Sequence, residues 1–302
     1  MHDVIVLGAG PAGVSAAVYA KSRGLDVVVL EQNRVGGMIA NVSLVTHFAG
    51  IGAEESGAQF ASRLSDQLQR SGIEVRHECV TSVRLEGPVK EIVTDKTTWQ
   101  AKAVILATGS TPRRLDIPGA KELTGKGFAL NAARDGMRYA GKDVYVVGGS
   151  DGAAKEALFL SKTSKEVTMI HFEEKLGAIA EFREKIAKTA NMRLLLGCRL
   201  AAVQGKDQVR SLTIRHEADG KEETITDEEC GIFVYAGTLP TTGLFTELPL
   251  HDGYIPVDGR QQTTIPGVFA AGDICAKQVR QVATAVSDGA VAAINAAAFV
   301  AR

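Results

Sequence analysis

Apolar residues run almost without interruption through two short segments, and each run is followed by glycines and then by a helical pattern. Residues 4–31, VIVLGAGPAGVSAAVYAKSRGLDVVVLE, predict a strand, a Gly-rich turn, a helix and a second strand. Residues 144–171, VYVVGGSDGAAKEALFLSKTSKEVTMIH, predict the same order. Continuous apolar strands that alternate with helices are typical of a parallel sheet buried on both faces.

The two segments are copies of each other at a constant offset, which pairs Gly8 with Gly148 and Gly13 with Ala153. Each copy is followed by shorter segments in which apolar and polar residues alternate, such as VRSLTIRHE at residues 209–217. This alternation predicts meander strands that lie over a parallel sheet. The sequence therefore predicts an α/β protein with two Rossmann-like domains of three layers, β/β/α, that bind dinucleotides.

Composition excludes several classes of protein. The chain has 302 residues, enough for two domains, with 45% hydrophobic and 23% charged residues, which is typical of a folded globular protein. A net charge of −1 and an aromatic content of 5% argue against a nucleic-acid partner, which would favour a basic surface or stacking residues.

Neither export nor metal binding is expected. The start, MHDVIVLGAG, enters a strand at once, so no signal peptide is predicted. No apolar run of about 18 residues is recognised, and the Ala-rich end is interpreted as a packed helix, so no membrane partner and a cytoplasmic location are expected. The cysteines are scattered and form neither C-x-x-C nor metal-ligand spacing: Cys79, Cys198, Cys230 and Cys275.

The first Gly-rich turn carries the strongest chemical signal. Gly8, Gly10 and Gly13 follow an apolar strand and open a helix, and Glu31 ends the next strand. In this context the glycines permit the tight turn, the approach of a pyrophosphate and close helix–strand packing. The helix N-terminus offers N–H groups to the phosphates, and the acid accepts a hydrogen bond from a ribose hydroxyl.

The turn itself reads GAGPAG, and three further motifs extend this signal over the whole chain: VILATGSTPRRLDIPGA, GVFAAGDI and RQVATAVSDGAVAA. Together they resemble the thioredoxin reductase family of flavoproteins. The resemblance implies FAD in an interrupted domain, residues 1–113 and 245–302. It also implies a pyridine-nucleotide-like domain, residues 114–244, inserted into the first, and a homodimer.

The resemblance also implies which residues contact FAD. They are Gly8, Gly10, Pro11, Ala12, Gly13, Glu31, Gly37, Met38, His47, Val80, Ala107, Thr108, Gly109, Gly272, Asp273, Arg280, Gln281 and Val282. Asp273 would bond a ribityl hydroxyl, and the last three residues would open a helix whose positive end faces the flavin. Two positions depart from the family's pattern. Met38 replaces Gln, and His47 replaces Asn. His47 either donates protons in the reaction or has only a structural role as a hydrogen-bond donor.

The family's redox-active Cys pair would align with Asn131 and Arg134, and neither residue can form a mixed disulfide. The weak catalytic candidates that remain are His47, Arg134 and Asp135. Arg134 either places a positive charge near the flavin or is an ordinary surface residue, and Asp135 is interpreted as a helix N-cap. Cys275 is expected to be a packing residue near the flavin, with a second thiol route as the alternative.

The second nucleotide site, expected at Gly148, Ser150, Gly152, Ala153 and Glu173, is altered. Ser150 stands where a glycine would admit the pyrophosphate, and the family's three NADPH-binding arginines align with Phe172, Glu173 and Gly177. These changes disfavour NADPH and leave NADH possible, with Glu173 or Glu174 accepting from a 2′-hydroxyl. The NADH-using flavoprotein of alkyl hydroperoxide reductase, a member of the same family, likewise has apolar or acidic residues here.

Three functions follow from these residues. The first is an FAD-dependent oxidoreductase that takes hydride from NADH and passes electrons to a small acceptor or an electron-carrier protein, without dithiol chemistry. The second is a flavoprotein that uses no pyridine nucleotide and is fed by ferredoxin or flavodoxin, with a repurposed second site. The third is an FAD-binding interaction or sensor module.

Overall fold

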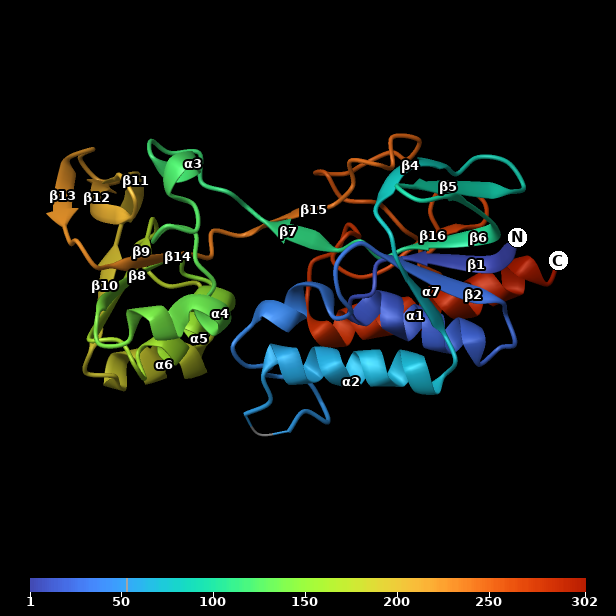
Figure 1. Cartoon of the computed structure of the whole chain (residues 1–302), viewed down its shortest axis with the longest axis horizontal. Helices are drawn as coiled ribbons and strands as arrows, with labels where there is room; N and C mark the ends of the chain where they lie inside the picture. Colours follow the sequence, from blue (N-terminus) through green and yellow to red (C-terminus); the bar gives the residue numbers. More distant parts are fainter. Residues whose placement is uncertain (53) are drawn as a thin grey trace. The chain divides into compact units, whose positions relative to one another are not determined.

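The computed structural model describes residues 1–52 and 54–302, which divide into two compact units (Figure 1). The first unit consists of Met1–Ala40, Leu44–Thr111 and Leu239–Arg302. The second unit consists of Pro112–Thr238, with Asn41–Ser43 grouped with it. The second unit is thus inserted into the sequence of the first.

A seven-stranded sheet forms the centre of the first unit, in the order β3-β2-β1-β6-β5-β4, with β16 also paired to β6. Its strands are β1 (His2–Leu7), β2 (Val27–Glu31), β3 (Glu74–His77), β4 (Val80–Arg84), β5 (Lys90–Thr94), β6 (Thr98–Leu106) and β16 (Val268–Ala270). The pairs β3–β2, β2–β1, β1–β6 and β6–β16 are parallel, whereas β4, β5 and β6 form an antiparallel meander.

Helices cover one face of the parallel strands of this sheet, and β4 and β5 of the meander cover the other (Figure 1). The helical elements of the unit are α1 (Pro11–Lys21), the 3-10 turn η1 (Gly37–Asn41), α2 (Gly57–Arg70) and α7 (Val282–Val300). Alternate residues of β1 point to opposite sides. Ile5 and Leu7 pack with Leu85 and Ile92 of the meander side, and Val6 lies next to α1.

The C-terminal helix α7 packs closely against α1. A Cβ added to Gly289 would lie 2.1 Å from the carbonyl oxygen of Ala12. The Ser15 hydroxyl donates to the carbonyl of Val286 over 2.7 Å. Within the described residues, α7 is the one helix whose length and composition alone would also suit a membrane span, a test that the packed core helix of a folded protein passes as well. Packing against another helix accounts for the small, apolar residues of α7.

The second unit repeats the three layers. Its parallel sheet has the order β10-β9-β8-β14, and a separate antiparallel sheet has the order β11-β12-β13. The strands are β8 (Asp143–Val147), β9 (Glu166–His171), β10 (Met192–Leu196), β11 (Cys198–Gly205), β12 (Val209–His216), β13 (Glu222–Thr226) and β14 (Gly231–Val234). The helical elements are α3 (Ala120–Leu123), α4 (Ala132–Asp135), η2 (Gly136–Tyr139), α5 (Asp151–Leu160) and α6 (Ala180–Lys188). Val144 and Val146 pack with the helices, and Tyr145 and Val147 pack with the antiparallel sheet.

Strand register confirms the internal repeat. Val4 of β1 is opposite Val27 of β2, and Val144 of β8 is opposite Val167 of β9, at the same offset. The two Rossmann-like, three-layer domains predicted from the sequence are therefore present.

The connection between the units differs from the predicted boundaries at residues 113–114 and 244–245. The short strands β7 (Ser110–Pro112) and β15 (Thr238–Pro240) pair with each other. Immediately after β15, the amide of Thr241 donates to the carbonyl of Gly109, and its own carbonyl accepts from the Thr108 hydroxyl. These bonds join the returning chain to the first unit at Leu239, before the expected boundary.

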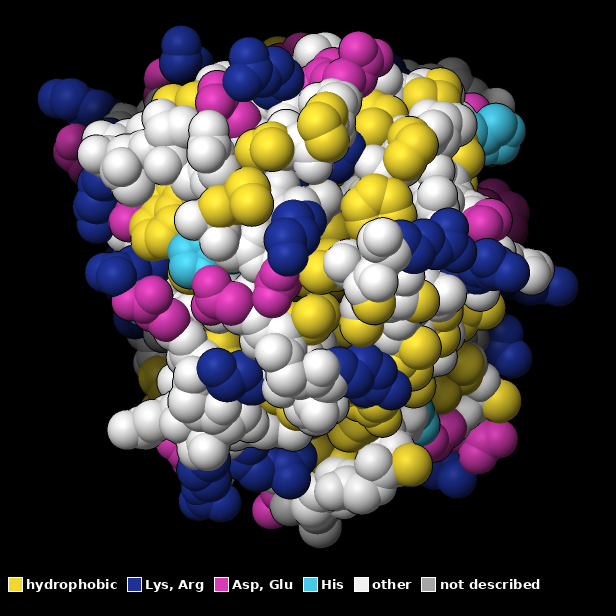
Figure 2. Space-filling view, turned by 90° about the vertical axis from the view of Figure 1, so that its right-hand side faces the viewer, with side chains coloured by type: hydrophobic (Ala, Val, Ile, Leu, Met, Phe, Trp, Pro, Cys, Tyr) yellow, Lys and Arg dark blue, Asp and Glu magenta, His cyan; other side chains and the backbone are white. Residues whose placement is uncertain are grey.

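Figure 2 shows the side of the molecule at the right of Figure 1, where both termini lie. Lys and Arg side chains are mixed there with Asp and Glu, and hydrophobic side chains lie between them. Neither sign of charge dominates this face, in keeping with the net charge of −1.

Candidate dinucleotide sites

Two glycines of the β1–α1 turn are required by packing of the protein itself. Gly8 has a φ of +100° and its amide donates to the carbonyl of Leu30 over 2.8 Å. A Cβ on Gly8 would lie 2.4 Å from the carbonyl oxygen of Ala107, and one on Gly13 would lie 1.9 Å from that of Gly8. Larger residues at either position would separate α1 from the sheet.

Gly10 is different, because folding does not require a glycine there. It is the N-cap of α1 with φ −73° and ψ −179°, which any residue adopts, and a Cβ would lie 4.0 Å from its nearest neighbour, the carbonyl oxygen of Gly36. Pro11 follows at the first helical position, and the first turn contains no acid. The glycine thus keeps the N-terminus of α1 clear, as a pyrophosphate needs.

Glu31 ends β2 beside this turn. Its Oε2 accepts from the amide of Ala9 over 2.9 Å, and its Oε1 accepts from the amide of Asn33 over 2.8 Å. A carboxylate has about four lone-pair sites, so these two bonds fix its position and leave it able to accept more. Val80 begins β4 just beyond Glu78, whose amide donates to the carbonyl of Glu31.

The carboxyl ends of β6 and β16 reach the same edge of the sheet, because both strands run parallel to β1. The expected residues Ala107, Thr108 and Gly109 follow β6, and Gly272 and Asp273 follow β16. Burial raises the pKa of Asp273, and nearby Lys277 and Arg280 oppose that rise. In the described part of the chain, no group forms a hydrogen bond with the Asp273 carboxylate. A carboxylate with free acceptor sites fits a residue that binds a ligand hydroxyl.

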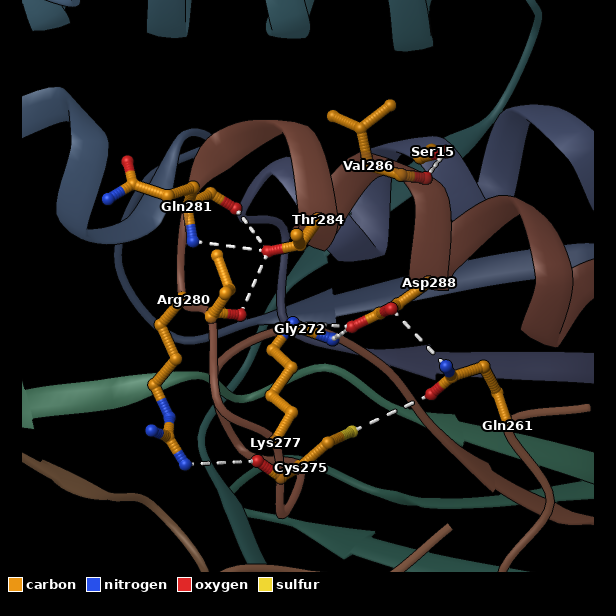
Figure 3. Close-up of polar contacts among 11 residues, drawn as sticks. Ser15, Gln261, Gly272, Cys275, Lys277, Arg280, Gln281, Thr284, Val286 and Asp288 are labelled. Atoms are coloured by element: carbon orange, nitrogen blue, oxygen red, sulfur yellow. Dashed lines mark hydrogen bonds and ion pairs between the residues drawn. The ribbon is translucent and has the colours of Figure 1, made fainter. Parts of the chain in front are cut away.

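The N-terminus of α7 lies beyond that turn (Figure 3). Gln281 is the N-cap, in a capping box with Thr284, and Val282 is the first helical residue. The Arg280 guanidinium stacks 3.9 Å from the centre of the Tyr254 ring, and its Nη2 donates to the Cys275 carbonyl over 3.4 Å. Its Nε is buried with no partner among the described residues, so a donor remains next to the positive end of a helix.

The two residues that depart from the family's pattern have local structural reasons. Gly37 has a φ of +57° and packs on Gly10, and the next residue, Met38, accepts at Sδ from the Ser110 hydroxyl over 3.5 Å. His47 has a left-handed backbone with a φ of 58°. Asn and His both tolerate that region better than most residues, which favours the structural interpretation of the replacement.

Asp135 stands at the N-cap position of η2, as interpreted from the sequence, but its side chain caps no amide of that turn, and Asn131 is the residue that caps α4. The Asn131 side chain accepts from the Arg134 amide over 2.9 Å. The buried Asp135 carboxylate accepts from Arg134 Nε (3.0 Å), Arg134 Nη2 (2.8 Å) and the Asn131 amide (2.9 Å). The Arg134 hydrogen bonds hold the pKa of Asp135 below its usual value despite burial. Arg134 is therefore a paired charge rather than an isolated one.

The cysteines form no disulfide among the described residues, and all four are free. Burial raises the pKa of Cys275 to about 12, and its Sγ lies 3.8 Å from Gln261 Oε1. It is therefore a neutral thiol at physiological pH, which agrees with a packing residue.

The second Gly-rich turn has the backbone of the first. Gly148 has a φ of +134°, its amide donates to the carbonyl of Ile170, and a Cβ would lie 2.3 Å from the carbonyl oxygen of Tyr235. Ala153 is fully buried beside it. Ser150 is the N-cap of α5 with φ −78° and ψ 174°, close to the angles of Gly10, and its hydroxyl caps no amide of the helix. Gly152, in the first turn of α5, has only Ser150 Oγ, at 3.9 Å, near the position of an added Cβ.

The end of β9 separates the two acids considered for ribose binding. The His171 ring packs against Gly149 of the turn, and its Nε2 lies 3.1 Å from Glu173 Oε2. Glu174 instead points to Gly197, where an added Cβ would lie 2.5 Å from its Oε1. Glu173 is thus next to the nucleotide turn and Glu174 is not. The sequence alone gave no indication of Arg199, which stacks 4.8 Å from the centre of the Phe172 ring.

These features define a class of protein: an oxidoreductase with two Rossmann-like dinucleotide-binding domains. The model of the pyridine nucleotide-disulphide oxidoreductase family matches residues 2–289, so the chain belongs to this family. The thioredoxin reductase of Peptoclostridium acidaminophilum is 36% identical over 306 residues, covering 99% of this chain and 97% of the relative.

Solved structures agree with the family. Lactococcus lactis thioredoxin reductase (FR conformation) matches with a TM-score of 0.95 and 30% identity, covering 100% of this chain and 99% of that one. Thioredoxin reductase from T. acidophilum matches with a TM-score of 0.94 and 32% identity, covering 100% and 99%. The chain is a thioredoxin reductase-like flavoprotein oxidoreductase, and its family implies FAD and a pyridine nucleotide.

Replacing Arg134 by Ala should lower the free energy of unfolding by about 1 kcal/mol at pH 7, because Asp135 loses two charged hydrogen bonds. A carboxyl whose pKa is lowered by folding stabilises the protein above its unfolded pKa, and that contribution disappears as the pH falls. The difference between wild type and variant should therefore shrink below about pH 4 in denaturant titrations. Arg138→Ala is the control, since its Nη1 lies 3.9 Å from Asp135 Oδ1, and it should have a smaller effect. An equal loss at pH 3 and pH 7 would contradict the charge argument.

Proposed function

We propose that this protein is an FAD-dependent oxidoreductase that accepts hydride from NADH and passes electrons to a small acceptor or an electron-carrier protein without a dithiol. The observation that carries the proposal lies at α4. Asn131 and Arg134, where the family's Cys pair is expected, are a helix cap and the partner of Asp135. The relatives compared above are named thioredoxin reductases, and this chain has no C-x-x-C to reduce a disulfide through.

FAD is proposed to bind at the β1–α1 turn. The open N-terminus of α1 at Gly10 suits the pyrophosphate, and the fixed carboxylate of Glu31 suits a ribose. The unpaired Asp273 carboxylate suits the ribityl chain, and the Arg280–Val282 end of α7 suits an edge that gains negative charge. When bound, FAD supplies the two-electron carrier, and these residues orient it.

NADH is the proposed donor, and Glu173 is the proposed determinant of that choice. A carboxylate at this position accepts from a 2′-hydroxyl and repels a 2′-phosphate. Because the Glu173 side chain is 58% exposed, salt and solvent weaken that repulsion. Ser150 favours the alternative, a flavoprotein fed by ferredoxin or flavodoxin. It is the N-cap of α5, the position in the second turn that corresponds to Gly10, and it carries a side chain where Gly10 has none. The homodimer and the cytoplasmic location stay predictions.

The purified protein should be yellow, with about one FAD per chain, and Gly10→Val should abolish flavin retention because a branched side chain would occupy the pyrophosphate's path. The variant should still fold, since Gly10 has an ordinary backbone and open surroundings. Flavin absorbance and circular dichroism measure the two effects. Gly259→Val is the matched control, because a Cβ there has open surroundings, with nothing within 4 Å. A folded Gly10→Val protein that retains FAD would contradict the assignment.

Thioredoxin and small disulfides should not be reduced at a useful rate with any donor, because no described cysteine has a partner thiol. A coupled disulfide-reduction assay on the wild type and on Cys275→Ser separates two failures of this prediction. Turnover that persists in Cys275→Ser would reveal another thiol route. Turnover that disappears there would make Cys275 a catalyst rather than a packing residue.

NADPH should bind roughly 10- to 100-fold more weakly than NADH, since each 1.4 kcal/mol is tenfold and the Coulomb repulsion is partly screened. Glu173→Arg should narrow or invert the preference, whereas Glu174→Arg, whose acid lies against Gly197, should not. Ser150→Gly should improve both nucleotides together.

Anaerobic stopped-flow reduction with NADH, NADPH and reduced ferredoxin measures these differences on one preparation. If ferredoxin reduces the flavin and neither nucleotide does so within minutes, the alternative replaces the hydride proposal. If no donor does, the FAD-binding sensor module is favoured.

A further inference from the structure

Asp288, on the second turn of α7, accepts hydrogen bonds from the loop that follows β16 and from Gln261 (Figure 3). Its Oδ2 accepts from the amide of Gly272 over 3.0 Å and from Lys277 Nζ over 2.6 Å. Its Oδ1 accepts from Gln261 Nε2 over 3.2 Å. The Asp288 side chain is only 13% exposed and that of Lys277 is 18% exposed, so this ion pair is shielded from solvent.

The hydrogen bond from Gly272 to Asp288 fixes a turn in which no side chain fits at position 272. Gly272 has a φ of +85°, and an added Cβ would lie 2.8 Å from the Cβ of Ala12 on α1. β16 ends at Ala270, so the strand ladder no longer holds this amide and Asp288 accepts from it instead. The next residue is Asp273, whose carboxylate is the proposed ribityl contact. The direction of that carboxylate therefore depends on a bond made by Asp288.

The bond to Lys277 fixes the loop that leads into α7. Within this loop the amide of Cys275 donates to the Gly272 carbonyl over 3.1 Å, and Arg280 donates to the Cys275 carbonyl. Asp288 thus ties the loop at both Gly272 and Lys277 to the helix that the loop enters. The N-terminus of α7 is held in one place relative to the Asp273 turn.

The pair also controls charge near Asp273. Lys277 and Arg280 are the cations close to that carboxylate. While Lys277 is bound to Asp288, its ammonium is occupied. Without that partner, the same ammonium can turn to Asp273 and compete with a ligand hydroxyl for the carboxylate.

We propose that Asp288 is a positioning residue of the flavin site, which acts through Gly272 and Lys277 to present Asp273 and the first turn of α7 to FAD. The proposal rests on the FAD site proposed above. Asp288 itself touches no cofactor, and its effect is on the geometry and the charge of residues that do.

The test is FAD affinity in Asp288→Asn, measured by flavin fluorescence after dilution of the holoprotein. The dissociation constant should rise about tenfold, the equivalent of one charged hydrogen bond. Asp3→Asn is the matched control. Asp3 also binds a lysine, Lys102 Nζ at 2.8 Å, and a backbone amide, Asp26 N at 3.1 Å, but it lies at the opposite end of β1. The control should keep its FAD affinity within about twofold of wild type while losing a comparable amount of thermal stability.

A second variant separates positioning from general destabilisation. Asp288→Asn combined with Lys277→Met should bind FAD more tightly than Asp288→Asn alone, because no released ammonium competes for Asp273. The proposal is overturned if Asp288→Asn loses stability but keeps wild-type FAD affinity. It is equally overturned if Asp3→Asn weakens FAD as much, or if removing Lys277 brings no recovery. Retention of FAD by Gly10→Val would instead show that the FAD site itself was assigned wrongly.

Discussion

Close backbone contact around the first turn of α1 is the constraint on which the first unit depends. Gly8 meets the carbonyl of Ala107 and Gly13 meets that of Gly8, at distances that exclude any Cβ. Gly289 of α7 and Gly272 of the β16 turn make similar contacts with Ala12. Segments from the beginning, middle and end of the chain are thereby held within reach of one helix N-terminus. A dinucleotide site on this edge follows from packing that the protein needs in any case.

Comparison of the two Gly-rich turns separates what the fold requires from what a ligand requires. Gly8 and Gly148 both have a positive φ. Each lies against the carbonyl of the residue that follows a neighbouring strand, Ala107 after β6 and Tyr235 after β14, so the fold requires a glycine at both positions. Gly10 and Ser150 have nearly the same backbone angles, and neither position needs a glycine for folding. Folding therefore does not account for the difference between Gly10 and Ser150. The second unit keeps the architecture of a nucleotide site and changes the groups that would face the nucleotide.

The parts of this structure that could be predicted from the sequence are those set by local periodicity and by the repeat. Apolar runs next to Gly-rich turns located the parallel strands, and the constant offset between the copies predicted that the second unit repeats the first. The expected residues at Gly8–Gly13, Ala107–Gly109 and Gly272–Asp273 come together because parallel strands end at one edge. The Ala-rich end was interpreted as a packed helix, but its sequence did not show which helix it packs on, because small apolar residues suit many helix partners.

Side-chain direction was beyond the sequence. Glu173 and Glu174 are adjacent and chemically identical, yet one bonds His171 beside the nucleotide turn and the other lies against Gly197. Which of them can meet a ribose is decided by how the chain turns after β9, and no local pattern encodes that turn. Asp288 is a similar case, because its partners at Gly272 and Gln261 are distant in sequence and meet it only through the packing of α7 on the sheet. A buried acid that accepts from a backbone amide next to a proposed ligand contact is found by following hydrogen bonds outward from the site. The proposed flavin contacts thus depend on residues such as Asp288 that hold them in place.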